Sequence, residues 1–353
     1  MATVLHILPH PGGGAETYID VLEGLDGYRH LRVPLSTTRS RLLGAALVLG
    51  RWPRIARAAR WADIVHAHGD TAAILAAPLL SGRPSMITPQ GLHRLRRSTG
   101  ARGWPAVRGM RAAVGAAART ACSANAERDD LAAILPPALH SRLVVVPNGI
   151  PLPAPRRPEG RARAREALGV GEDDVVALYV GRLEARKEPL TAIGAVEQAR
   201  ARGAPLTLLL AGAGPLEPQV SARAGHGIRP LGHRDDIAEL YRAADLFVAP
   251  SRREGMSFAV LEAMSHGLVP VVSEGPGNAE AVGVAGVRFA AGDVVGLSDR
   301  LARLAADPAE RERLGAAARD RMRDELSAER FLARMRELYE GVVRERPAPP
   351  YGA

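Results

Sequence analysis

Short apolar runs alternate with segments of helical spacing along the whole chain. The first half holds five apolar runs that predict buried strands: Thr3–Leu8, Asp63–Gly69, Pro84–Thr88, Ala118–Ser123 and Arg142–Pro147. The second half holds four: Val175–Val180, Leu206–Ala211, Asp245–Ala249 and Val269–Ser273. Apolar strands that alternate with helices are typical of parallel sheets covered by helices on both faces. The pattern predicts an α/β protein with two Rossmann-like domains.

The segments between the strands carry helical spacing, and one stretch between the halves does not. Predicted helices include Ala15–Gly24, Asp235–Ala244, Ser257–Ser265 and the amphipathic Ala328–Val343. The stretch Pro147–Pro155 is rich in proline and glycine, which marks a linker. We therefore predict domains at 1–150 and 151–326, a helix at 327–345 that crosses back to the first domain, and a tail at 346–353.

Composition sets the class of protein and its compartment. A chain of 353 residues with 46% apolar residues suits two domains that each bury a core. The lone cysteine, Cys122, cannot form an internal disulfide, and we expect it to be a buried packing residue. Neither a signal peptide nor an apolar run of spanning length is evident. We expect a cytoplasmic protein, with peripheral attachment to a membrane as an open possibility.

Positive charge is concentrated in the first half. Residues 1–150 contain 18 basic and 9 acidic residues, a net charge of +9, whereas the remainder balances. The arginines form two clusters: Arg51, Arg54, Arg57 and Arg60, then Arg94, Arg96, Arg97, Arg102, Arg108 and Arg111. Such clusters attract phosphates or anionic lipid headgroups, although an arginine-rich solvated helix face would look the same. Aromatic residues make up only 4%, which disfavours a nucleic-acid partner because few rings are present to stack on bases.

The clearest local signal is a basic segment directly after a predicted strand. Gly181 follows Val175–Val180, and Arg182 and Lys187 come next. Lys187 is the only lysine in the chain. Arginine and lysine supply different kinds of positive charge, and a departing diphosphate needs such stabilisation. Chance survival of one surface lysine is the alternative.

A second signal is a pair of glutamates that brackets the start of a predicted helix. Glu254 follows a strand by a short loop, and Glu262 lies along the helix. Gly255 and Ser257 fall at the helix start, where free N–H groups and the helix dipole favour phosphate. Two solvent-facing glutamates on an amphipathic helix would give the same spacing.

Taken in order, these motifs resemble glycosyltransferase family 4, the retaining family of GT-B fold. The specific part of the resemblance is the combination of the Arg182/Lys187 pair, Ala211–Pro215 and Glu254–Glu262. Supporting segments are Gly12–Glu16, Asp63–Gly69, Ser123–Glu127 and Val146–Ile150. The resemblance runs through nearly the whole chain and implies two Rossmann-like domains that face each other across a cleft.

The resemblance also implies roles for particular residues. Arg182 and Lys187 would neutralise the diphosphate leaving group, Glu254 would hold the donor sugar, and Glu262 would bind ribose. The remaining donor contacts would be Gly13, Gly14, Gly181, Gly212, Gly255, Met256, Ser257 and Phe258. The reaction would move a hexose-type sugar with retention of configuration. It would need neither cofactor nor metal, because cationic side chains would replace the metal.

Contacts to the acceptor or the sugar are expected from the first domain, where the chain departs from the family. The expected residues are Glu16, His68, Gln90 and His93. The family often has a histidine in the setting Thr-x-His-Gly, and this chain has Gln90 there. Gln90 can donate hydrogen bonds but cannot carry a proton, so the departure concerns the donor sugar more than the reaction.

Two other departures stand in the linker and after the lysine. Glu188 stands where a glycine usually follows the lysine, and Pro151 stands where an aspartate is usual. His66 and His68 point the same way on a strand and could be a metal pair, but no third ligand is evident nearby, so we expect a structural or substrate-edge role.

The expected partners are a nucleotide diphosphate sugar, a sugar or lipid-linked acceptor and an anionic membrane surface. The alternatives to transfer are an epimerase or phosphorylase on the same fold and a non-enzymatic polyanion-binding or membrane-binding protein. The sequence does not specify the donor sugar, the nucleotide base, the acceptor, the linkage or the oligomeric state.

Overall fold

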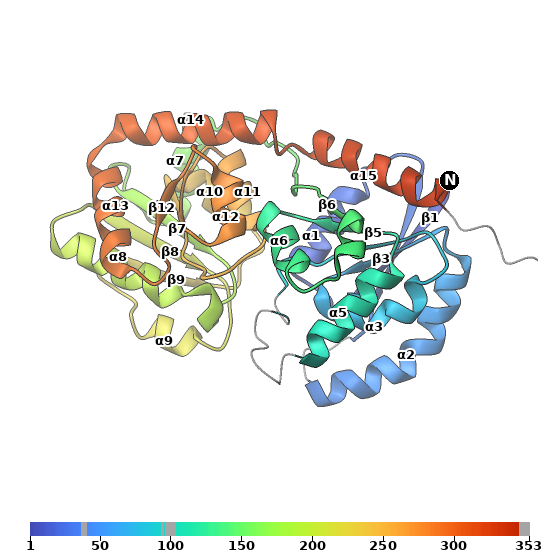
Figure 1. Cartoon of the computed structure of the whole chain (residues 1–353). Helices are drawn as coiled ribbons and strands as arrows, with labels where there is room; N and C mark the ends of the chain where they lie inside the picture. Colours follow the sequence, from blue (N-terminus) through green and yellow to red (C-terminus); the bar gives the residue numbers. More distant parts are fainter. Residues whose placement is uncertain (37–40, 93–94, 96–103, 346–353) are drawn as a thin grey trace, which may run out of the picture. The chain divides into compact units, whose positions relative to one another are not determined.

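The computed structural model describes residues 1–36, 41–92, 95 and 104–345, with side chains 41–49 excepted, and it divides into two compact units (Figure 1). Unit 1 combines Met1–Gly149 with the C-terminal segment that starts at Ala328. Unit 2 is the continuous segment Ile150–Ser327. The boundaries expected after residues 150 and 326 each lie one residue from these.

Unit 1 is built on a parallel sheet of six strands in the order β2-β1-β3-β4-β5-β6. Its strands are β1 (Ala2–Leu8), β2 (Tyr28–Pro34), β3 (Ile64–His68), β4 (Ser85–Thr88), β5 (Arg119–Cys122) and β6 (Leu143–Val145). In the register of β1 and β3, His6 pairs with His66. Every pair of neighbouring strands is parallel, so the carboxyl ends of all six strands meet at one edge of the sheet.

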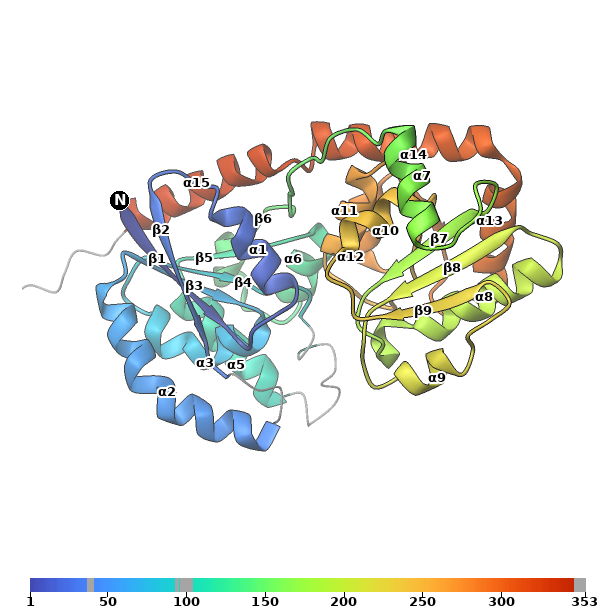
Figure 2. The same ribbon diagram turned by 180° about the vertical axis from the view of Figure 1, so that it is seen from behind.

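Helices cover both faces of this sheet (Figures 1 and 2). In the described part of unit 1 the helices are α1 (Gly14–Leu22), α2 (Arg41–Trp61), α3 (Asp70–Leu80), α5 (Trp104–Ala116), α6 (Asn125–Ala132), the 3-10 helix η2 (Pro137–Arg142) and α15 (Ala328–Arg344). Leu5, Ile7 and Val65 pack with α2, α3 and α5 in one apolar core. His6 and His66 alternate with these residues along the strands, so they point to the opposite face.

The helix α15 packs onto that opposite face with α1. The ring of Phe331 meets the ring of Tyr18 edge-on at 5.0 Å, and the Tyr18 hydroxyl contacts the sulfur of Met335 at 3.3 Å. Phe331, Met335 and Tyr339 are buried. A segment from the end of the chain therefore completes the core of the first unit.

Unit 2 repeats the design with a second parallel six-stranded sheet in the order β12-β11-β10-β7-β8-β9. Its strands are β7 (Val175–Val180), β8 (Leu206–Ala211), β9 (Ile228–Gly232), β10 (Leu246–Ala249), β11 (Val269–Ser273) and β12 (Val287–Phe289). The helices are α7 (Pro158–Ala167), the 3-10 helix η3 (Ala185–Lys187), α8 (Pro189–Ala201), α9 (Glu217–Ser221), α10 (Ile237–Ala243), α11 (Phe258–Ser265), α12 (Pro276–Val282), α13 (Val294–Ala306) and α14 (Pro308–Asp324). The predicted α/β class with two Rossmann-like units is confirmed.

Three strands escaped the sequence prediction, and each is an edge strand: β2, β9 and β12. β2 mixes arginine and histidine with apolar residues, β9 contains Pro230, and β12 has three residues. An edge strand has a neighbour on one side only, so it needs less apolar character than a central strand.

Among the described residues, no helix is both long and apolar enough to span a membrane.

Candidate functional site

The carboxyl edge of the unit 2 sheet brings the loops after β7 and β8 into backbone contact. A Cβ atom on Gly212 would lie 1.9 Å from the carbonyl oxygen of Gly181, and one on Gly214 would lie 2.5 Å from that of Leu183. Hydrogen bonds join the same loops, from Gly181 N to Ala211 O at 3.0 Å and from Leu216 N to Leu183 O at 2.8 Å. Only glycine fits at these two positions. The loop that carries the basic segment is thereby fixed to its neighbour.

A tight turn after β7 directs two consecutive cations at one carboxylate. The 3-10 turn η3 closes with Lys187 N bonded to Glu184 O at 2.9 Å, and Glu188 follows in the left-handed conformation with φ 50°. The Lys187 Nζ atom lies 2.9 Å from Oε1 of Glu254, and Nη1 of Arg186 lies 2.6 Å from the same oxygen. The Glu254 side chain is 8% exposed. The structure thus brings together Lys187 and Glu254, which are 67 residues apart by position.

Arg182 belongs to the same charge cluster at its exposed side. Its Nε atom lies 3.7 Å from Oε2 of Glu184, whose other oxygen accepts from Arg186 at 2.9 Å. The Arg182 side chain is 45% exposed and the Lys187 side chain 20%. Arg186 and Glu184 were not singled out from the sequence. The arrangement offers an anion two accessible cations at the carboxyl edge of the sheet, where ligands bind in open α/β folds.

The loop before α11 holds the remaining predicted donor contacts of unit 2. Gly255 is backed by Gly277, on which a Cβ atom would lie 2.4 Å from the Gly255 carbonyl carbon. Ser257 caps α11 without a side-chain bond, and its N–H faces Oδ1 of Asn278 at 3.4 Å. Phe258 begins the helix. The dipole and N–H groups of a helix start favour anions, which suits this loop to binding phosphate.

Glu262 lies on α11 and already has a hydrogen-bond partner. The Tyr241 hydroxyl donates to Oε2 of Glu262 at 2.8 Å, and the Tyr241 ring stacks on His266 at 5.1 Å. Burial raises the pKa of the Glu262 carboxyl, partly offset by the Tyr241 bond. A carboxylate with one oxygen held by Tyr241 is oriented and ready to accept from further hydroxyl groups.

In unit 1, the glycine loop after β1 leads directly into α1. Gly12 and Gly13 have φ of 83° and 91°, and Gly13 caps the helix. Glu16 lies half-buried in the first turn, and its N–H donates to Gly13 O at 2.9 Å. Nothing lies within 4 Å of a Cβ placed on Gly13, so the glycine is required there by the backbone angle alone.

The loop after β4 is strained at the position of Gln90. Gln90, Gly91 and Leu92 all have positive φ, at 55°, 100° and 51°. The buried carboxylate of Glu127 secures this loop by accepting from the N–H of Gly91 and, at 2.7 Å, from the N–H of Ser123. The Gln90 Nε2 atom is buried and has no hydrogen-bond partner among the described residues. Strained, over-determined backbone of this kind concentrates at functional sites. His93 lies outside the described residues.

Three buried histidines and the half-buried His30 form a layer between the unit 1 sheet and helices α1 and α15. His6 is central, with Nε2 2.8 Å from Nδ1 of His30 and Nδ1 2.8 Å from Nε2 of His68. His66 contacts the Tyr339 hydroxyl at 2.9 Å and Oγ1 of Thr88 at 2.8 Å. Burial lowers the pKa of His6 and His68 and brings that of His66 to about 3. These imidazoles are neutral structural groups.

Two expectations about His68 need correction. Its side chain is 0% exposed and faces His6, so the ring is not placed to contact a sugar or an acceptor. The statement that no third ligand lies near His66 and His68 was also wrong, because His6 offers a ring nitrogen and the three nitrogens lie within 4.8 Å of one another.

The present geometry of the three rings favours hydrogen bonding over metal binding. The rings of His66 and His68 are tilted by 33° with their centroids 4.0 Å apart. Both ring nitrogens of His66 already have partners. Burial is the largest cause that lowers the pKa of His6, followed by the neighbouring histidines and then by the positive charge of Arg32.

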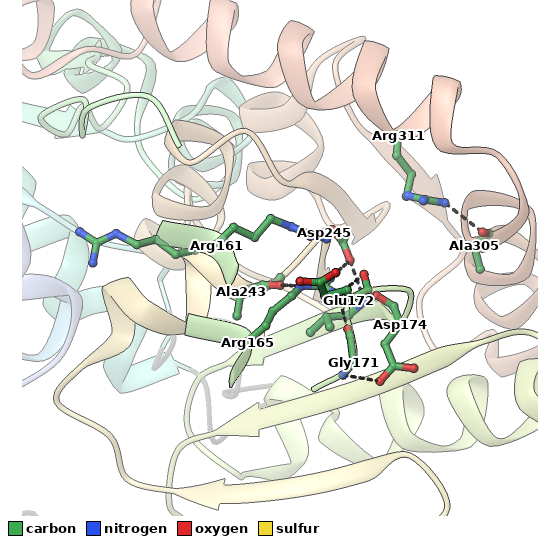
Figure 3. Close-up of polar contacts among 12 residues, drawn as sticks. Arg161, Arg165, Gly171, Glu172, Asp174, Ala243, Asp245, Ala305 and Arg311 are labelled. Atoms are coloured by element: carbon green, nitrogen blue, oxygen red, sulfur yellow. Dashed lines mark hydrogen bonds and ion pairs between the residues drawn. The ribbon is translucent and has the colours of Figure 1, made fainter. Parts of the chain in front are cut away.

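The amino edge of the unit 2 sheet holds a second arginine cluster with a structural role (Figure 3). Arg165 is buried, and its guanidinium donates to the carbonyl oxygens of Ala243 at 3.1 Å and Asp174 at 2.9 Å. Its Nη2 atom lies 2.7 Å from Oδ2 of Asp245, which also accepts from Arg161 through Oδ1 at 2.6 Å. This network ties α7 to the segments that precede β7 and β10.

A cavity of about 690 Å³ opens beside this network and is lined by Arg157, Arg161, Glu159 and Asp173, among others. The lining mixes both signs of charge, and the buried guanidinium of Arg165 already binds a backbone carbonyl and Asp245. Because it lies at the amino edge, we do not assign the donor site there. Cys122 is buried and burial raises its pKa, in agreement with a packing role.

Comparison with known proteins bears on both units. Residues 4–153 match the family model described as Glycosyltransferase Family 4, and residues 174–307 match the one described as Glycosyl transferases group 1. D-inositol 3-phosphate glycosyltransferase of Streptomyces bingchenggensis is 31% identical over 223 residues, which cover 58% of this chain and 49% of that protein. The same-named protein of Xylanimonas cellulosilytica is 29% identical over 318 residues, 83% of this chain and 75% of that protein. The chain thus spans about half the length of the first of these curated relatives.

A solved structure supports the fold over the full length. The crystal structure of Anabaena HepE in complex with UDP-glucose superposes with a TM-score of 0.82 at 18% identity, covering 97% of this chain and 100% of that one. At this identity the likeness concerns the fold. Together with the two family matches, which cover most of the chain, it identifies this protein as a member of the glycosyltransferases of GT-B fold, with a family 4 match in the first unit and a group 1 match in the second.

Proposed function

We propose that this chain transfers a hexose-type sugar from a nucleotide diphosphate donor to a glycan, lipid-linked or small-molecule acceptor, with retention of anomeric configuration. The observation that carries the proposal is the cationic turn after β7. It offers Arg182 and Lys187 at the carboxyl edge of unit 2, beside the Glu254 carboxylate. Family membership and a neighbour of the same fold solved with UDP-glucose support a nucleotide sugar as donor.

In this proposal the two cations stabilise the departing diphosphate. Negative charge grows on the phosphate oxygens as the bond to the sugar breaks, and preorganised cations there lower the barrier. Arg182 provides a planar fork and Lys187 a compact charge, so neighbouring phosphate oxygens can each find a partner. The side chains take the part that a divalent metal takes in other transferases.

The other donor groups are held by the two glutamates and the loop between them. Glu254 accepts from sugar hydroxyls, and Glu262, oriented by Tyr241, accepts from ribose hydroxyls. The N–H groups of Gly255, Met256 and Ser257 lie at the start of α11 and bind phosphate or sugar oxygens. Gly181 and Gly212 let the backbone approach the donor closely.

Unit 1 supplies Gly13 and Gly14 to the donor, and Glu16, Gln90 and His93 to the acceptor or the sugar. Gln90 carries no titratable proton, so it cannot accept the proton of the attacking hydroxyl. A diphosphate oxygen of the leaving group is the base at hand on the same face of the sugar. Attack from that face yields the retained anomer.

A thermal-shift screen with UDP-glucose, UDP-galactose, UDP-N-acetylglucosamine and GDP-mannose tests the donor. A ligand that binds the native state at about 100 times its Kd adds about 2.7 kcal/mol of stability, a shift of several degrees. NMR of the product formed with a simple sugar acceptor then reports the anomer. An inverted product would contradict retention, and loss of turnover on chelation would contradict metal independence.

Replacing Lys187 with alanine tests the leaving-group assignment. We expect donor turnover to fall about 10²- to 10³-fold, because one charge on the developing phosphate anion is lost. Arg223→Ala is the matched control, since Arg223 pairs with Glu197 elsewhere on unit 2. Turnover equal to that of the unchanged enzyme would refute the assignment.

A membrane surface is the proposed place of the acceptor. At the end of α2, Trp61 is 81% exposed, and Arg54, Arg57 and Arg60 are exposed on the same helix. Tryptophan beside arginine is typical of surfaces that meet anionic lipid headgroups. We expect the protein to co-sediment with phosphatidylglycerol vesicles at low salt and to be released from them at high salt. Equal binding to neutral vesicles would contradict the electrostatic attraction.

A further inference from the structure

Arg186 shares the Glu254 carboxylate with Lys187, although only the lysine has a proposed part in binding the donor. Both cations lie on one oxygen, Arg186 Nη1 at 2.6 Å and Lys187 Nζ at 2.9 Å from Oε1. Consecutive side chains seldom converge. Both residues belong to the 3-10 turn that ends at the left-handed Glu188.

A second carboxylate anchors Arg186 from behind. Its Nη2 atom lies 2.9 Å from Oε1 of Glu184, and its side chain is 23% exposed. The Nε atom of Arg186 is buried and has no partner among the described residues. The guanidinium has therefore given up one hydrogen bond to engage Glu184 and Glu254 at the same time, which indicates that the two carboxylates set its orientation.

Donor binding changes the charge balance around Glu254. When a diphosphate draws Lys187 away, Glu254 loses one of the cations that neutralise it. A carboxylate with 8% exposure that lost all its cations would be costly. Arg186, held by Glu184, is able to stay.

We propose that Arg186 is a positioning residue that keeps the Glu254 carboxylate charge-paired and aimed at the donor sugar while Lys187 moves onto the diphosphate. This rests on the proposed function of the same site. Arg186 itself acts through Glu254 and touches neither phosphate nor sugar. Without it, Lys187 would have to serve the carboxylate and the diphosphate together.

Binding measurements separate this role from direct phosphate binding. Isothermal titration with UDP and UDP-glucose, or with GDP and GDP-mannose if those stabilise the protein instead, gives both affinities without an acceptor. For Arg186→Gln we expect the nucleotide sugar to bind about 10- to 100-fold more weakly, since small misplacement of a contact group costs this much. The nucleotide alone should lose less than about 10-fold, because only the competition for Lys187 affects it. Arg186→Lys should recover most of the loss, and Arg223→Gln should leave both affinities unchanged.

A double-mutant cycle decides whether the effect runs through Glu254. In a Glu254→Gln background, Arg186→Gln should change either affinity by less than about twofold, because the group that Arg186 positions is gone. Independent, additive losses would overturn the proposal, as would an Arg186→Gln variant with wild-type affinities or one that loses nucleotide and nucleotide sugar equally. A wild-type protein that binds none of these ligands would refute the proposed function instead. Circular dichroism melting of each variant detects misfolding, and a variant that melts normally but binds nothing contradicts the expected split.

Discussion

At the scale of single residues, the candidate site depends on backbone conformations that few residue types accept. Glu188 has φ 50° and ψ 48° directly after Lys187. The Glu188 carboxylate pairs with Arg252 and is 10% exposed. A residue other than glycine costs energy in the left-handed conformation, so the chain stores strain at the position that directly follows Lys187.

Replacing Glu188 with glycine and with alanine isolates that strain. Both changes remove the carboxylate and its pairing with Arg252, and only glycine relieves the backbone. We expect Glu188→Gly to be more stable than Glu188→Ala by about 1 kcal/mol. Urea unfolding measures the difference. An alanine variant as stable as the glycine variant would show that the left-handed conformation carries no cost.

At the scale of elements, the two sheets are joined to their helices in different ways. Unit 2 fixes its loops by backbone contact between glycines and its amino edge by the Arg165–Asp245 network. Unit 1 instead buries a hydrogen-bonded layer of His6, His66 and His68 under α1 and α15. The contact between the glycine loops and the histidine layer can each be tested by substitution.

Gly212→Ala tests the contact between the loops after β7 and β8. The added Cβ would lie 1.9 Å from the Gly181 carbonyl oxygen, so the loop must move. Gly203→Ala is the matched control, because Gly203 also has positive φ but nothing lies within 4 Å of its Cβ. We expect Gly203→Ala to lower the free energy of unfolding by about 1 kcal/mol and to preserve donor affinity. Gly212→Ala should lower the free energy of unfolding by more and weaken donor binding at least about 10-fold. Equal behaviour of the two variants would contradict a fixed loop.

The histidine layer predicts that unit 1 loses stability in mild acid. Burial lowers the pKa of these histidines, that of His66 to about 3, so the unfolded chain binds protons before the native state does. Stability is then complete above the ordinary histidine pKa of about 6.5 and is lost as pH falls below it, by up to about 1.4 kcal/mol per pH unit for each histidine. Urea unfolding between about pH 7.5 and pH 5 measures the slope.

His66→Gln is the control for that slope, because glutamine keeps a hydrogen-bonding side chain but does not titrate. It should reduce the dependence on pH by about one histidine's share. A wild-type midpoint that does not change over this range would show that the layer takes up protons as readily as the unfolded chain.

At the scale of the whole molecule, the chain is shared unequally between its units. Unit 2 is one continuous segment, whereas unit 1 includes α15, which follows unit 2 in the chain. Phe331, Met335 and Tyr339 contribute buried side chains to unit 1 from that helix. Any event that detaches α15 exposes the layer around Tyr18 and His66.

This division predicts how fragments behave. A fragment 150–327 should fold alone and melt cooperatively. A fragment 1–149 should be unstable, because each large buried apolar side chain of α15 contributes about 1.5–3 kcal/mol and domains have only about 5–15 kcal/mol in total. Adding a peptide of residues 328–345 should restore its melting transition in circular dichroism. A fragment 1–149 that melts like the full chain would contradict the need for α15.

The sequence alone determined the elements whose signal is local. Central strands such as β7, β8 and β11 are buried on both faces, so their apolar runs predicted them to the residue. Arg182, Lys187, Glu254 and Glu262 could be named as candidates from the sequence because motifs follow strand ends in this fold class. Three of the four edge strands, β2, β9 and β12, escaped because one free side relaxes the apolar pattern, whereas the fourth, β6, kept an apolar run and was predicted.

Only the tertiary structure decided which side chains meet. His68 looked like a substrate contact, but strand register and the packing of α1 and α15 bury it against His6. Arg186 and Glu184 gave no signal, because their importance lies in a carboxylate that the fold brings from 68 positions beyond Arg186. Patterns of apolar spacing report burial along one element, whereas contacts between charged groups depend on distances that folding alone sets.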